Sequence, residues 1–119
     1  MANTAGSSAS LAAEAYRHRN AARTLVVKGA TDAVFREGVL LGECRGPNIP
    51  AMEAIGGTGD TITGMLIALR SMGDQNAELK ALTVNRLAGR RINCTPATQI
   101  REFIGAIAAG LEEYEKDHL

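Results

Sequence analysis

The sequence predicts an α/β fold in which a small sheet with a β-hairpin packs against several helices. One β-rich apolar run lies at residues 24–28, and two more flank a two-residue turn at residues 37–38. Helical periodicity dominates from residue 60 onward. The 119 residues suffice for one domain, so we expect a flexible lead over residues 1–10 and a single domain over residues 11–119.

Composition narrows the class of protein. The chain is 45% hydrophobic but only 3% aromatic, so we expect an aliphatic, alanine-rich core. Thirteen basic and thirteen acidic side chains cancel, which argues against nucleic acid or a membrane as the main partner. The N-terminus lacks the charged and apolar regions of a secretory signal, and no apolar run approaches the ~20 residues of a membrane span. We therefore expect a cytoplasmic protein.

The cysteines and histidines are too dispersed to suggest a metal site. Cys44 and Cys94 lie far apart in a chain without an export signal, so we expect free thiols. His18 and His118 belong to no spaced cluster of ligands, and we interpret both as solvated helix residues. The sequence therefore predicts no metal-ligating residues.

The N-terminal elements are a short helix and a strand. The helix is amphipathic, and Ser8 or Ser10 is a candidate N-cap. Residues 24–28 form a continuously apolar run that ends at Gly29. Such a run suits a strand covered on both faces, as in a parallel sheet.

A hairpin and a loop follow. Residues 33–36 and 39–44 are β-rich and flank Glu37-Gly38, a two-residue turn that ends in glycine. Residues 46–50 contain one glycine and two prolines and predict a loop.

Three helices complete the expected fold. The first extends from about Asp60 to Met72, and the second covers residues 77–90. The last starts at Thr95-Pro96, with threonine as the N-cap and proline in the first turn. Asn85 lies on the buried stripe of the second helix, where an asparagine is more often a satisfied interior amide than a ligand contact.

The run Gly56-Gly57-Thr58-Gly59-Asp60 is the main candidate for chemistry. A glycine-rich turn that leads into a helix N-terminus presents free N–H groups to an anion. An acid beside a phosphate suggests proton abstraction from a hydroxyl. Locally, the glycines could equally form an ordinary turn, and Asp60 could simply stabilise the helix dipole. Gly64 costs ~1 kcal/mol against alanine inside the helix, which suggests close packing against a neighbour or a ligand.

This run resembles the signature of a known superfamily. Residues 57–64, Gly-Thr-Gly-Asp-Thr-Ile-Thr-Gly, are similar to the G-[TS]-G-D-x-[LIF]-[AST]-G motif of the ribokinase-like superfamily. Val26-Val27-Lys28-Gly29, the hairpin, Pro50-Ala51-Met52 and the glycine run follow the order found in NAD(P)H-hydrate dehydratases, the YjeF-type carbohydrate kinases. The resemblance extends from about Leu11 to Leu111 and implies the C-terminal half of a ribokinase-like domain.

The resemblance also implies roles for individual residues. Asp60 would take the proton from the substrate hydroxyl, which is then phosphorylated at the expense of ATP or ADP with Mg²⁺, and elimination (lyase chemistry) would restore the nicotinamide ring. The anion hole would consist of Gly56, Gly57, Thr58 and Gly59. The strand end that contacts the nucleotide would be Lys28, Gly29, Ala30 and Thr31. Lys28 could pair with phosphate, although a lysine that closes a strand is more often solvated.

Departures from the family limit these expectations. The family domain is more than twice as long, and its other half supplies much of the substrate pocket. We therefore expect a homo-oligomer or a separately encoded complementary half, and catalysis only where such a partner completes the site. Glu53 adds a carboxylate near the phosphate site, where it would weaken anion binding unless it points away or holds Mg²⁺. A sugar, thiazole or pyrimidine kinase and a non-catalytic binding or assembly module remain alternatives.

Overall fold

The computed structural model describes the backbone of residues 5–118 and the side chains of residues 9–118. The chain divides into two compact units, Met1–Arg45 and Gly46–Leu119, which we name unit 1 and unit 2 and describe separately. Over residues 5–118, unit 1 contains one helix and three strands, and the regular secondary structure of unit 2 is helical. The α/β class is confirmed in this coarse form, whereas the expected single domain and its ribokinase-like identity stay predictions.

Unit 1 starts with α1 (Ala5–Arg17). The helix begins before Ser8 and Ser10, so the prediction that either serine is its N-cap is wrong. Residues 5–10, expected to be a flexible lead, belong to this helix, and residues 1–4 lie outside the described part of the chain. Ala5 and Ala9 favour this extension of the helix, although Gly6 and the three serines have lower helix propensity.

The sheet of unit 1 is an antiparallel meander in the order β1-β2-β3. It consists of β1 (Thr24–Val27), β2 (Asp32–Arg36) and β3 (Val39–Cys44). The expected parallel sheet is wrong, because β1 pairs antiparallel with β2 and lies at an edge. All four residues of β1 are half-buried, which explains why the run is apolar without alternating. Within residues 5–118, the outer edge of β1 has no strand partner.

The predicted hairpin is confirmed. Glu37 and Gly38 have φ of 52° and 80°, the two positive values that a type I′ turn requires. A Cβ on Gly38 would lie 3.1 Å from the Cα of Ala13, so α1 packs closely on the turn. Ala12 of α1 meets Ala33 and Phe35 of β2 in the apolar core of this unit.

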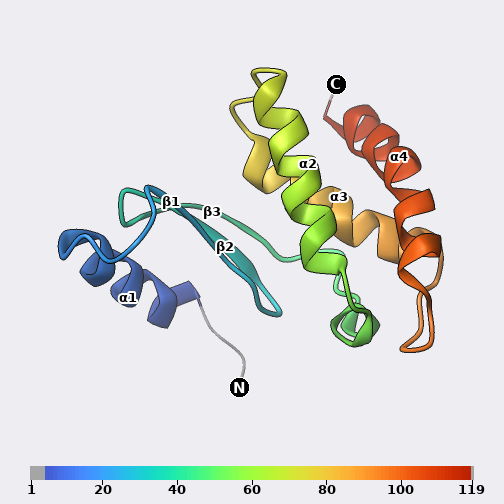
Figure 1. Ribbon diagram of the computed structural model, residues 1–119, viewed down its shortest axis with the longest axis horizontal. Coiled ribbons are helices and arrows are strands. Elements are labelled where there is room, and N and C mark those ends of the chain that lie inside the picture. The colour runs from blue at the N-terminus through green and yellow to red at the C-terminus, as the bar shows by residue number, and fades with distance from the viewer. Residues whose placement is uncertain (1–4, 119) are drawn as a thin grey trace. The chain divides into compact units, whose positions relative to one another are not determined.

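Unit 2 is a helical assembly around one central helix. The 3₁₀ helix η1 (Pro50–Ala54) precedes α2 (Thr58–Ser71), α3 (Ala77–Arg91) and α4 (Ile100–Asp117). Helix α3 packs against both α2 and α4, as Figure 1 shows. Its central position explains why the predicted stripe of Ala81, Leu82, Asn85, Ala88 and Gly89 is buried.

Helix α4 begins later than the sequence predicts. Thr95-Pro96 does not start it, because Thr95 forms a turn in which its Oγ1 accepts a hydrogen bond from the N–H of Ala97. The cap is Gln99, which forms a capping box with Glu102. Gly110 lies inside α4, where an added Cβ would be 3.2 Å from the carbonyl oxygen of Val84, so this glycine permits close packing on α3.

The apolar surface is incompletely covered. Met72, which directly follows α2, is 81% exposed, and Ile104 of α4 is 54% exposed. Leu11 and Val39 of unit 1 are also exposed. Among the helices of residues 5–118, none combines the length and the apolar character that crossing a bilayer requires.

Candidate functional site

The start of α2 is held in place by apolar packing beneath it. Met52 of η1 is buried, and its Sδ lies so close to Gly89 of α3 that a Cβ on this glycine would be only 2.6 Å away. Ile55 is buried as the chain leaves η1. The Thr58 hydroxyl is 3.4 Å from the carbonyl oxygen of Ile55 and adds a weak tie between η1 and α2. The glycine run therefore starts from an anchored segment.

The first turn of α2 presents unpaired backbone N–H groups. Gly57 is the N-cap in the left-handed conformation, with φ of 99°, and no side chain caps the helix. Thr61 is the first residue whose N–H bonds to the helix backbone, at 3.1 Å from the carbonyl oxygen of Gly57. Of the residues that the structure describes, none accepts a hydrogen bond from the N–H groups of Thr58, Gly59 or Asp60. Three donors and the positive end of the helix dipole thus converge at this point.

The surface around these donors is open. Gly56 and Gly59 are exposed, and a Cβ on either would meet nothing within 4 Å. Asp60 is also exposed, and its carboxylate has no ion pair or hydrogen bond within residues 5–118. A Cβ added to Gly64 would also meet nothing within 4 Å, so the prediction that this glycine is needed for close packing against another part of the chain is wrong for the described residues. A ligand or a partner remains the other explanation for this glycine.

Asn85 of α3 contacts the same turn from the buried side. It is 1% exposed, its Nδ2 donates to the carbonyl oxygen of Thr58 at 3.0 Å, and its Oδ1 lies 2.6 Å from the Thr61 hydroxyl. The prediction of a satisfied interior amide is confirmed. The sequence did not indicate that the hydrogen-bond partners of this amide lie in the first turn of α2.

The predicted nucleotide-contacting residues Lys28, Gly29, Ala30 and Thr31 lie between β1 and β2 of unit 1. The Lys28 ammonium is 3.0 Å from a carboxylate oxygen of the fully buried Asp32. The other oxygen of Asp32 accepts a hydrogen bond from the N–H of Gly29. Lys28 is therefore held by a carboxylate, a partner that the sequence analysis missed although Asp32 lies only four residues away.

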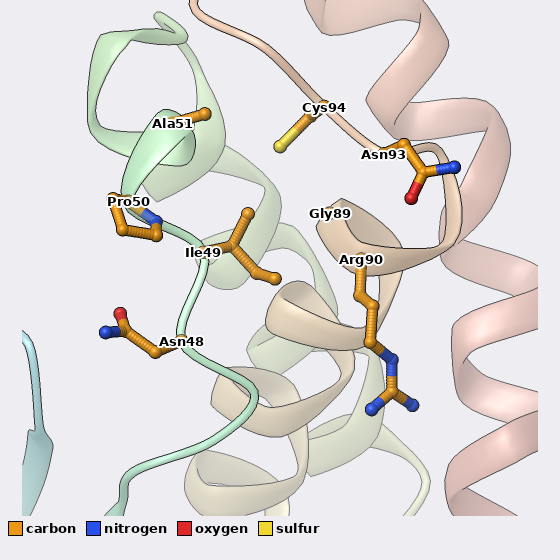
Figure 2. Close-up of a pocket in the computed structure, with 8 residues that line it drawn as sticks. All are labelled: Asn48, Ile49, Pro50, Ala51, Gly89, Arg90, Asn93 and Cys94. Carbon is orange, nitrogen blue, oxygen red and sulfur yellow. The ribbon is translucent and has the colours of Figure 1, made fainter.

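A separate cavity of about 320 Å³ lies between the segment before η1 and the end of α3. In Figure 2, Cys94 extends from the loop after α3 toward the segment that holds Ile49 and Ala51. Burial raises the pKa of the Cys94 thiol, which makes the reactive thiolate scarcer. Arg90, also on this lining, pairs with Glu113 at 2.8 Å. No pattern in the sequence indicated this cavity.

Cysteines and acidic residues do not form a metal centre in the described part. Cys44 is buried and Cys94 half-buried, and both are free thiols, as predicted. No three histidine, cysteine, aspartate or glutamate side chains gather to hold a metal ion in residues 5–118. Glu53 is exposed on η1.

Comparison with known proteins finds a relative whose own function is uncharacterized. Over 90 residues the chain is 43% identical to Uncharacterized protein MJ1337 of Methanocaldococcus jannaschii. The alignment covers 74% of this chain but only 39% of that protein, so the chain matches well under half of its relative. No family model matches the sequence. No solved structure matches it either.

The structure thus brings part of the predicted site together. Gly56, Gly57, Thr58, Gly59 and Asp60 form one exposed turn in unit 2. Residues 28–31 form another turn, which belongs to unit 1. The convergence of the two turns on one nucleotide stays a prediction.

Proposed function

We propose that this protein binds the phosphate groups of ATP or ADP at the first turn of α2, in the manner of NAD(P)H-hydrate dehydratases and carbohydrate kinases. The observation that carries this proposal is the set of three unpaired N–H groups on Thr58, Gly59 and Asp60. Such donors at a helix N-terminus suit a phosphate, because the helix dipole also favours negative charge there.

The open space around the turn supports the same proposal. Gly56, Gly59 and Gly64 leave the backbone bare and approachable. A glycine inside a helix costs ~1 kcal/mol against alanine. An added Cβ at Gly59 or Gly64 would clash with nothing in the described chain, so packing within the chain does not explain these glycines. The close approach of a ligand or partner would explain why glycine is present there despite its lower helix propensity.

Asp60 is the proposed general base. Its carboxylate is exposed beside the N–H groups and has no hydrogen-bond or ion-pair partner among the described residues, so it is free to accept a proton from a substrate hydroxyl. Catalysis would be phosphoryl transfer, followed by elimination if the substrate is hydrated NADH or NADPH. Mg²⁺ would accompany the nucleotide.

The proposed site needs a further component to hold the substrate. We propose that a second copy or a separately encoded half supplies it, because the outer edge of β1 and several apolar side chains are uncovered in the described part. Light scattering at micromolar concentration tests whether the protein forms a homo-oligomer. A monodisperse monomer would contradict a stable homo-oligomer.

The decisive binding experiment is a thermal-shift and calorimetric screen with ATP, ADP, AMP, NADH and hydrated NADH, with and without Mg²⁺. A ligand at 100 times its Kd stabilises the folded state by about 2.7 kcal/mol. We expect ATP or ADP to raise the melting temperature. A flat response over the whole panel would favour a non-catalytic assembly module.

Asp60→Asn separates catalysis from binding. The variant keeps the shape of the side chain but removes the base, so we expect nucleotide binding to persist while turnover is lost. In a pure binding module, the same variant leaves every activity unchanged or tightens phosphate binding by removing a negative charge. Turnover at the wild-type rate would exclude Asp60 as the base.

A further inference from the structure

A buried side chain of α3 forms hydrogen bonds with the first turn of α2. Asn85 of α3 donates to the carbonyl oxygen of Thr58 at 3.0 Å and accepts from the Thr61 hydroxyl at 2.6 Å. The amide is 1% exposed, and no buried side-chain nitrogen or oxygen in the described residues is left without a partner. Both ends of the carboxamide are therefore committed to this turn.

The attachment differs from an ordinary helix cap in what it leaves free. An N-cap side chain fixes a helix start by accepting a hydrogen bond from an N–H group of the first turn, which occupies that donor. Gly57 has no side chain with which to do so, and no other side chain caps α2. Asn85 instead contacts a carbonyl and a hydroxyl, so the N–H groups of Thr58, Gly59 and Asp60 stay available.

We propose that Asn85 is a positioning residue that holds the N–H groups of the first turn in the arrangement needed to bind an anion. Two glycines precede and one lies within this turn, so the backbone would otherwise sample many conformations. An ordered turn avoids the entropy cost of fixing it when the ligand arrives. The effect on affinity rests on the proposed phosphate binding, whereas the ordering of the turn does not.

The test compares Asn85→Ala with a matched variant at the other end of α2. Glu78 of α3 is 2% exposed and pairs with Arg70 in the last turn of α2. Glu78→Gln therefore loosens the same pair of helices away from the glycines. Thr61→Val, which removes one of the two Asn85 contacts, serves as a milder variant if Asn85→Ala folds poorly.

Two measurements are made on the full chain. Calorimetry with ADP gives the affinity, and the heteronuclear NOE of backbone amides in the ligand-free protein reports the order of residues 58–60. We expect Asn85→Ala to weaken ADP binding by about tenfold and to lower the NOE of these amides. For Glu78→Gln, we expect affinity within about twofold of wild type and an unchanged NOE at residues 58–60.

The outcomes distinguish phosphate binding at the first turn of α2 from the ordering of that turn by Asn85. If wild type binds no nucleotide but Asn85→Ala still loosens residues 58–60, the phosphate proposal fails and the ordering role stands. If the NOE of these amides is unchanged in Asn85→Ala and Thr61→Val, Asn85 does not position the turn. Equal losses of affinity in Asn85→Ala and Glu78→Gln, at equal losses of stability, would also overturn the positioning role.

Discussion

Gly59→Ala should make the free protein more stable and its nucleotide binding weaker. Gly59 lies in the first turn of α2, is exposed, and would place a Cβ where no atom lies within 4 Å. Nothing in the described chain therefore opposes the substitution. Alanine in a helix is favoured over glycine by about 1 kcal/mol, because glycine loses more backbone entropy.

The size of the stability gain can be measured by thermal unfolding. For a unit of 60–100 residues, 1 kcal/mol corresponds to roughly 4–8 °C in melting temperature. Gly105→Ala is the matched control: Gly105 lies inside α4, is exposed, and also has nothing within 4 Å of an added Cβ. We expect both variants to melt at a higher temperature than wild type.

The two variants should differ in binding. A methyl group on residue 59 would stand beside the N–H groups proposed to hold phosphate, and the loss of one hydrogen bond to a charged group costs about 1.5–3 kcal/mol. We expect Gly59→Ala to weaken ADP binding by about tenfold to a hundredfold in calorimetry, and Gly105→Ala to leave it unchanged. Unaltered affinity in a stabilised Gly59→Ala protein would refute the idea that a ligand approaches this backbone.

Two further predictions concern the packing of α4 on α3. Gly110→Ala should lower the free energy of unfolding by about 1–3 kcal/mol, because its Cβ would lie 3.2 Å from the carbonyl oxygen of Val84. Denaturant unfolding measures this change, and the control Gly105→Ala should instead raise the free energy of unfolding. The second prediction concerns Lys80 and Asp74. The pKa of Lys80 is raised by its hydrogen bond to Glu115 and by Asp74. The pKa of Asp74 is lowered by its hydrogen bond from the N–H of Asn76 and by Lys80. The Asp74 contribution is present above its ordinary pKa of 3.8 and is lost as pH falls through its lower folded value. The Lys80 contribution is complete below its ordinary pKa of 10.5 and is lost as pH rises through its higher folded value. The difference in unfolding free energy between wild type and Lys80→Met should therefore be largest between these limits, and a difference independent of pH would contradict an electrostatic role.

Local patterns predicted the elements whose boundaries depend on nearby residues. Glu37-Gly38 specified the hairpin, because a two-residue turn with positive φ at both positions favours such residues. The buried stripe around Asn85 followed from helical spacing. The start of α4 did not follow from its local signal, since Thr95-Pro96 forms a turn and Gln99 caps the helix.

For the candidate site, the sequence by itself determined that glycines precede a helix and that an acid stands in its first turn. Only the tertiary structure decided that the donors of this turn are unpaired and that Asn85 holds the turn from the buried side. It also decided that Lys28 pairs with Asp32 and that Met72 is exposed. Residue type and spacing dictate local backbone conformation, whereas the partner of a polar group depends on which distant segments the fold brings beside it.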